Sequence, residues 1–214
     1  MKEFINRTHP VFSASAPGRL DVMGGIADYS GSLLLQMPVR ERTTVTLQPR
    51  EEPLLWIRSV DTHAGYAEFQ MDMALLDRYL FSELGQQVRS MPQGDWAVYI
   101  VGCLSLFRQT HEFPWKGLSV LVESSIPQGK GVSSSASLEI AFLQALTQGI
   151  PQSFSALDIP LLGQRAENQV VGAPCGLMDQ LSTYFGRAHQ LLPLVCQPHE
   201  VLSPIPLPSS LQFF

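Results

Sequence analysis

Apolar and polar residues alternate through much of the first third of the chain, a period typical of strands with one buried face. The clearest case is residues 38–48, where Val39, Val45 and Leu47 fall on the same side of an extended chain. Shorter segments of the same kind are residues 11–15, 54–60 and 66–70. The pattern predicts that this third of the chain is mostly sheet.

The period changes to that of a helix after residue 71. Residues 72–84 and 95–109 carry apolar side chains at helical spacing, and Asp95 stands where an N-cap would begin the second helix. Further on, the pattern predicts a buried strand at 117–123, a helix ending near 148, helices at 158–171 and 176–184, and a strand at 189–195. Strands first, then helices alternating with strands, indicate an α+β domain.

The charge balance and the apolar runs narrow the class of protein. Fourteen Lys and Arg against nineteen Asp and Glu give a net charge of -5, which argues against a nucleic-acid partner. The N-terminus lacks the apolar core of a signal peptide, and the longest apolar run, residues 96–107, is about half the length that spans a bilayer. We therefore expect a cytoplasmic protein with no membrane partner.

Cysteine usage and the C-terminal residues bear on domain organisation. The chain has three cysteines, Cys103, Cys175 and Cys196, and no two of them form a CxxC pair. An odd number without this motif predicts reduced thiols, no disulfide and no zinc site. Charged residues are 15% of the chain, against roughly 25% in typical soluble domains. Residues 204–214 end in apolar side chains, which is typical of a strand that another segment covers. We expect one domain over residues 1–198, followed by residues 199–214 as a linker and the start of an incomplete segment.

The loop before the helix that ends near residue 148 is the most informative segment. Gly129 and Gly131 permit close backbone approach, and the helix N-terminus behind them directs free N–H groups outward. Four serines follow where a cap needs one, so the others are free for phosphate oxygens or a metal: Ser133, Ser134, Ser135 and Ser137. The loop matches neither the Walker pattern nor GxGxxG. An ordinary glycine turn with a serine cap fits these residues equally well.

Three separate blocks resemble the GHMP kinases, and within them the galactokinase branch. The loop, PQGKGVSSSASLE at residues 127–139, is similar to the second motif of that family. APGRLDVMGGIADYSG at residues 16–31 resembles the galactokinase signature. Ala166 and Glu167, then Gly172 and CGLMDQ at residues 175–180, resemble its catalytic segment. Three blocks in the family's order make chance agreement a poor explanation.

The resemblance implies an ATP-dependent kinase that phosphorylates the anomeric hydroxyl of a sugar, with ATP and Mg²⁺ as cofactors. It also implies the GHMP kinase N-terminal fold, an α+β fold shared with a ribosomal protein domain. Asp179 matches the aspartate that accepts the hydroxyl proton or orients the hydroxyl, and Arg19 matches the arginine that stabilises charge beside it. On their own, these two residues fit a helix cap and a surface charge.

The resemblance also assigns the nucleotide and metal ligands. Ser135 and Glu167 match the magnesium ligands, with Ser134 as an alternative to the first. The implied nucleotide-binding residues are Gly129, Gly131, Ser133, Ser134, Ser135, Trp96 and Tyr99. Without the family, Glu167 fits a solvated helix position, and the two aromatic residues fit core packing as well as adenine binding.

The sugar-binding residues implied are Asp28, Gly25, Cys175 and Gly176. In galactokinases the first block reads Gly-Glu-His-Thr-Asp-Tyr, and its Glu and His hold the hydroxymethyl end of the sugar. Gly25 and Ile26 stand there in this chain and leave a buried hydroxyl unpaired, at a cost of about 1–3 kcal/mol. L-Arabinose has the same ring configuration without that carbon, and the block is also similar to that of L-arabinokinases. Glucuronic acid and other sugars stay open.

The chain departs from the family pattern at two places, and three alternatives to an arabinose kinase stay open. Val195, Cys196 and Gln197 stand where the family has Asp-Cys-Arg. The second, ferredoxin-like C-terminal domain and its third glycine motif are absent, which leaves an open cleft and makes transfer by this chain alone doubtful. The alternatives are a galactokinase-like sensor that binds sugar and ATP without turnover, galactokinase proper, and an inactive fragment of a kinase.

Overall fold

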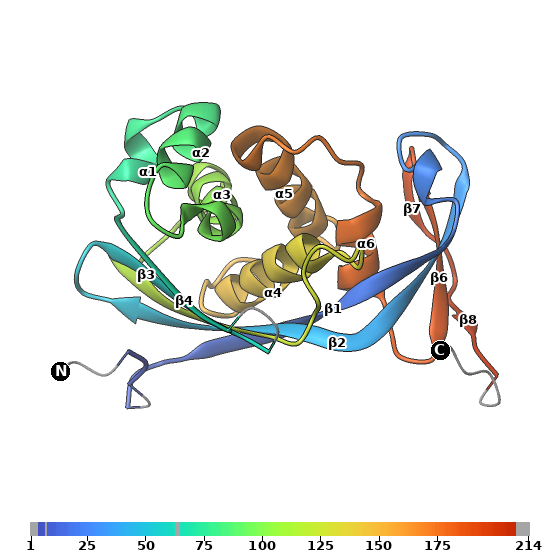
Figure 1. Ribbon diagram of the computed structural model, residues 1–214, viewed down its shortest axis with the longest axis horizontal. Coiled ribbons are helices and arrows are strands. Elements are labelled where there is room, and N and C mark those ends of the chain that lie inside the picture. Colours follow the sequence, from blue (N-terminus) through green and yellow to red (C-terminus); the bar gives the residue numbers. More distant parts are fainter. Residues whose placement is uncertain (1–3, 7, 63–64, 209–214) are drawn as a thin grey trace.

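The computed structural model describes residues 4–6, 8–62 and 65–208. A long twisted sheet forms one layer, and the helices cover one of its faces (Figure 1). This is the α+β arrangement that the order of apolar periods predicts. Part of the apolar tail at residues 204–214 lies outside the described residues.

Among the described residues the sheet has eight strands in the order β4-β3-β5-β2-β6-β7, with β1 paired to β2 and β8 paired to β6. All pairs are antiparallel except β3 with β5. Residues 199–206 add the last two short strands beside β6. The bounds are β1 Phe12–Met23, β2 Leu33–Arg50, β3 Leu54–Asp61, β4 Gly65–Asp72, β5 Gly117–Ser124, β6 Gln190–Cys196, β7 His199–Val201 and β8 Ile205–Pro206.

β1 is much longer than the predicted strand at 11–15. It pairs with β2 from Phe12 to Met23, with register shifts between Pro17 and Arg19 and between Asp21 and Met23. Pro17 has no N–H to donate, and the alternation is broken at the first shift, so the sequence hid this half of the strand. The strand therefore carries the first family block through the middle of the molecule.

The helices are α1 Leu75–Arg78, α2 Phe81–Arg89, α3 Gly94–Thr110, α4 Ser134–Gln148, α5 Asp158–Ala166 and α6 Met178–Phe185, with a π-helical extension of α5 at Glu167–Val171 and a short turn at Gly25–Ala27. The single helix predicted over 72–84 is wrong: Asp72 ends β4, and the extended backbone of Tyr79 and Leu80 separates α1 from α2. Asp95 is not the N-cap of α3. Gln93 holds that place with a φ of 63°.

The core lies between the sheet and the helices, with α3 at its centre. Eleven residues of α3 are buried, so the apolar run at 96–107 is a core helix as predicted. No helix among the described residues is both long and apolar enough to cross a membrane. Cys103 and Cys196 are buried, Cys175 is partly buried, and all three are free thiols.

Candidate active site

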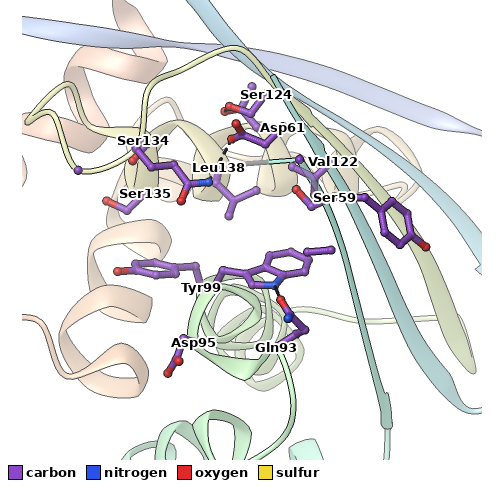
Figure 2. A pocket seen from close by; sticks show the side chains of 17 residues that line it. Ser59, Asp61, Gln93, Asp95, Tyr99, Val122, Ser124, Ser134, Ser135 and Leu138 are labelled. Carbon is purple, nitrogen blue, oxygen red and sulfur yellow. Dashed lines mark hydrogen bonds between the residues drawn. The ribbon is translucent and has the colours of Figure 1, made fainter. Parts of the chain in front are cut away.

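A cavity of about 540 Å³ opens where the glycine loop meets α3 and the ends of β3 and β5. Its lining brings together five residues predicted to bind the nucleotide: Gly129, Ser134, Ser135, Trp96 and Tyr99. The two serines begin α4 and lie across the cavity from Tyr99 (Figure 2). Elements far apart in the sequence therefore build one pocket with an aromatic side and a hydroxyl side.

Other residues that line this cavity were not predicted from the sequence as nucleotide-binding residues. Gln128 donates from Nε2 to Oδ2 of Asp61 at 3.1 Å, and Trp96 donates from Nε1 to Oε1 of Gln93 at 3.3 Å. Leu138 and Ser59 also line it (Figure 2). Gln128 belongs to the quoted loop, but Asp61 lies 67 positions earlier and no local pattern connects the two.

The loop holds the left-handed conformations that its glycines allow. Gly129 and Gly131 both have a φ of 68°, and Ser133 has a φ of 57° as the N-cap of α4. The hydroxyl of Ser133 is buried without a hydrogen bond and does not cap the helix. Neither Gly131 nor Ser133 lines the cavity itself. Ser137 is structural, because its hydroxyl donates to the carbonyl of Ala16 at 2.8 Å.

Arg19 and Asp179, 160 positions apart, form an ion pair beside this loop. Nε and Nη2 of Arg19 donate to Oδ1 of Asp179 at 2.9 and 2.6 Å. Nη1 donates to the carbonyl of Gly131 at 2.6 Å, and the backbone N–H of Arg19 donates to Val132 at 3.1 Å. The side chains are 11% and 27% exposed. One guanidinium thus fixes both the aspartate and the loop, so Arg19 is not a surface charge, and Asp179 is not the cap of α6, whose N-cap is Leu177.

Asp179 owes its place to the start of α6. It is the second residue of that helix, so its carboxylate lies in the first turn, where the helix dipole favours negative charge. No described residue donates to its Oδ2. The aspartate is therefore oriented through one oxygen and keeps the other available.

Behind Asp179 lies a buried group of carboxyl and amide side chains. The side chain of Gln180 donates to Oε2 of Glu167 at 2.8 Å and to Oε2 of Glu139 at 3.1 Å. Ser135 also hydrogen-bonds Glu167, and the thiol of Cys175 donates to it at 3.5 Å. Glu167 is 8% exposed, so the solvated-helix reading is wrong for this residue too.

Burial dominates the electrostatics of these two carboxyl groups. It raises the pKa of Glu167, against the opposing effect of the hydrogen bonds from Ser135 and Cys175. It raises the pKa of Glu139 well above the usual range, with the charge of Glu167 as the next cause. Glu139 stands in the second family block, yet its role in this network was not anticipated.

The predicted sugar residues gather next to the start of α6. Oδ1 of Asp28 accepts from the N–H of Met178 at 2.9 Å, and Cys196 hydrogen-bonds the same carboxylate. Burial raises the pKa of Asp28 despite these bonds. A Cβ on Gly176 would lie 2.1 Å from Oδ2 of Asp28, so any side chain there would push this carboxylate out of its place. The carbonyl of Cys175 accepts from Asn168 at 3.3 Å, which holds the chain entering this segment.

Gly25 and Ile26 occupy a short turn after β1. The N–H of Gly25 donates to both carboxylate oxygens of Asp21 at 3.1 and 3.0 Å, and Gln36 donates to the same aspartate at 2.7 Å. A Cβ on Gly25 would lie 2.2 Å from Oδ2 of Asp21. Ile26 is 99% exposed. No polar side chain is presented from these two positions.

Comparisons with known proteins agree with this geometry. Residues 98–187 match the GHMP kinases N terminal domain, and residues 2–49 match the galactokinase galactose-binding signature. The chain carries a GHMP kinase N-terminal domain. The two matched segments hold β1, the glycine loop, α4 and α6, whereas Asp61 and Trp96 of the nucleotide cavity lie between them.

The GHMP kinase domain is similar to characterised relatives. It is 36% identical to L-arabinokinase of Arabidopsis thaliana, over 98% of this chain and 23% of the relative. The structure of galactokinase from Lactococcus lactis, complexed with galactose, superposes with a TM-score of 0.72 at 25% identity, over 92% of this chain and 47% of that one. Mevalonate kinase of Methanococcus jannaschii superposes with a TM-score of 0.64 at 15% identity, which shows a shared fold. The chain thus spans less than half of each of the first two relatives.

Proposed function

We propose that this GHMP kinase domain phosphorylates the anomeric hydroxyl of a monosaccharide with ATP, and that the sugar is L-arabinose. The observation that carries the proposal is the ion pair of Arg19 and Asp179, tied to the loop through the carbonyl of Gly131. Phosphoryl transfer depends on positioning and on charge stabilisation more than on covalent chemistry. A carboxylate and a guanidinium fixed beside a phosphate-binding loop supply both.

Each member of the pair has a distinct role in this proposal. Oδ2 of Asp179, which no described residue occupies, accepts the hydrogen bond of the sugar hydroxyl and orients its oxygen toward the phosphate. Arg19 holds the aspartate through Oδ1 and places positive charge next to the loop where the phosphate charge develops. The free N–H groups at the start of α4 bind phosphate oxygens.

Magnesium is the cofactor that the loop and the buried carboxylate fit. Ser135 and Glu167, which hydrogen-bond each other, are hard oxygen donors of the kind Mg²⁺ prefers, and the ion usually keeps several waters. The buried Glu167 carries a raised pKa, so a cation would relieve its desolvation. No group of three or more His, Cys, Asp or Glu suited to a metal occurs in the described part of the chain. When bound, the ion would neutralise charge on the phosphates.

L-Arabinose is proposed from the absence of polar groups at one end of the sugar site. Gly25 and Ile26 present no hydrogen-bonding side chain there, and a side chain on Gly25 would displace the carboxylate of Asp21 from its bonds to the N–H of Gly25. A sugar with an exocyclic hydroxymethyl group would find no side-chain partner at these two positions. Asp28 remains to accept from ring hydroxyls. The 36% identity to an L-arabinokinase supports the same choice.

The test is ADP release with magnesium and ATP in the presence of L-arabinose or D-galactose. Two proteins are compared: this chain, and a chimera in which it replaces the matching region of the Arabidopsis relative. We expect turnover of L-arabinose with kcat/KM at least about tenfold above that for D-galactose. Asp179→Asn should abolish turnover in either protein. A preference for D-galactose would overturn the choice of sugar.

A matched control is available on the surface. Asp77 pairs with Arg108 at 2.9 Å, and its side chain is 65% exposed, so Asp77→Asn should leave turnover unchanged. Equilibrium binding of ATP and sugar to both variants shows whether the site is intact. Binding of both ligands without turnover, in the chain and in the chimera, would replace the kinase proposal with a sensor.

A further inference from the structure

A second cavity lies at the far end of α6 from Asp179. It measures about 360 Å³ and is lined by residues of β1, β2, α4, the end of α6 and the turn that follows it. None of its lining residues lines the nucleotide cavity, and none belongs to the sugar-binding or catalytic set. The lining residues that matter are Ser15, Arg42, Gln144 and Arg187.

Both arginines of this cavity are fixed by neutral partners. Arg42 donates from Nε to the hydroxyl of Ser15 at 2.9 Å and from Nη2 to its carbonyl at 2.8 Å. Arg187 donates from Nη1 to the carbonyls of Tyr184, Phe185 and Gly186 at 3.3, 3.2 and 3.0 Å. Within residues 4–6, 8–62 and 65–208, neither forms an ion pair with a carboxylate.

The cavity is therefore positive, and no acidic residue lines it. Partial burial lowers the pKa of Arg42, and the like charge of the nearby Arg187 lowers it further. Both side chains are exposed, so solvent screens part of this repulsion, and an anion bound between them would offset what remains. The carbonyls at the end of α6 accept hydrogen bonds from Nη1 of Arg187 alone and leave the rest of its charge without a partner among the described residues.

Several donors around the cavity have no partner among the described residues. They are Nη1 of Arg42, Nε and Nη2 of Arg187, and the side-chain amide of Gln144. Guanidinium groups bind the oxygens of phosphate in a planar, two-pronged geometry, and two of them suit a dianion. Capping of α6 by Arg187 uses a single nitrogen, so its other two nitrogens face solvent and are available to an anion.

We propose that this cavity binds the phosphate group of a small metabolite between Arg42 and Arg187. The space is large enough for a phosphomonoester as well as for inorganic phosphate. The phosphate site and the proposed catalytic residue lie at opposite ends of α6, which carries Asp179 in its first turn and ends at Phe185. The proposal stands independently of which sugar the kinase site accepts.

The experiment is a titration of the ¹⁵N-labelled chain with inorganic phosphate and with glycerol 3-phosphate, followed by NMR at constant ionic strength set with chloride. The backbone amides of Gly186 and Arg187 report this cavity, and those of Gly129 and Gly131 report the nucleotide loop separately. We expect a saturable shift at the first pair. Arg42→Gln and Arg187→Gln should each weaken that binding by about tenfold or more, leaving any shift at the loop unchanged.

Arg40→Gln is the matched control, because Arg40 is a neighbouring arginine on β2 whose side chain is 95% exposed and does not line this cavity. It should leave the phosphate affinity unchanged. Arg187 also caps α6, so Arg42→Gln serves as the variant that keeps the cap, and the NMR spectrum of each variant confirms its fold. The proposal fails if the shift at Gly186 is absent, if both arginine variants bind phosphate as the native chain does, or if hexaglutamate binds there and phosphate does not.

Discussion

At the scale of single residues, the site depends on how Arg19 divides its donors. Two nitrogens hold Asp179 and the third holds the loop at Gly131. A lysine keeps the charge but is a single point donor and cannot hold both partners at once. Exchange of Arg19 for lysine therefore keeps the positive charge but loses the simultaneous bonds to Asp179 and to the loop.

We expect Arg19→Lys to lower kcat by about 100-fold, because a preorganised donor to the reacting centre is lost. Steady-state kinetics with ATP and L-arabinose measure the effect. Arg108→Lys, in the surface pair with Asp77, is the control and should change kcat by less than about twofold. Equal rates for native protein and Arg19→Lys would show that the guanidinium geometry has no part in transfer.

Gly176 gives a second residue-scale prediction. A methyl group there meets the carboxylate of Asp28, whose bond to the N–H of Met178 fixes the predicted sugar ligand. Gly176→Ala should lower the free energy of unfolding by about 1–3 kcal/mol and raise the KM for the sugar. Urea unfolding and kinetics measure the two effects. Pro174→Ala, an exposed neighbour, should alter neither.

At the scale of elements, α4, α5 and α6 meet through Glu139, Gln180 and Glu167. The raised pKa of Glu139 means that the folded chain keeps a proton which the unfolded chain has released. The contribution of Glu139 to the free energy of unfolding is therefore complete below its unfolded pKa of about 4.5. It is lost as the pH rises toward the raised pKa of this carboxyl group in the folded chain. Stability should fall from pH 5 toward pH 8.

Glu139→Gln removes this dependence, because the amide has no proton to lose. Urea unfolding at pH 5 and pH 8 should show a smaller fall in the free energy of unfolding for the variant, by up to about 1.4 kcal/mol per pH unit while the native group titrates. Glu123→Gln, on the exposed side of β5, is the control and should follow the native curve. Identical falls in native protein and Glu139→Gln would contradict a buried, protonated Glu139.

The glycine loop is tested by Gly131→Ala. Its φ of 68° is costly for alanine, by about 1–2 kcal/mol, although a Cβ would meet no other atom. Gly172 has a φ of 73° and the same open surroundings, but it follows the π-helical extension of α5 and is not part of the glycine loop. Both variants should lose similar stability, and only Gly131→Ala should weaken ATP binding, as calorimetry would measure. Equal ATP affinities for the two variants would contradict the loop's role.

The sequence predicts elements well where the apolar period is unbroken. The strands at 38–48, 54–60, 66–70 and 117–123 are confirmed, with longer bounds, because alternation follows directly from a half-buried sheet. The second half of β1 was missed because a bulge at Pro17 interrupts that alternation. The split between α1 and α2 was missed because two extended residues leave the apolar spacing almost unchanged.

At the scale of the whole molecule, the site consists of contacts between distant segments. The pairing of residue 19 with residue 179, and of Gln128 with Asp61, depends on the sheet order and has no local signal. The family resemblance predicted that Arg19 and Asp179 act together, and the structure brings them together. Nothing in the sequence predicted the contact of Gln128 with Asp61. The arginines of the second cavity are 145 positions apart and could be found only once α6 was placed against β1 and β2.

The measurement that tests the central claim most directly is a ³¹P NMR spectrum of the chimera after incubation with magnesium, ATP and L-arabinose. The account predicts a new phosphomonoester signal coupled to the anomeric proton of the sugar, which is absent with Asp179→Asn and present with Asp77→Asn. ATP consumption that yields inorganic phosphate alone, or a phosphosugar that still forms with Asp179→Asn, would contradict a kinase centre built on Arg19 and Asp179.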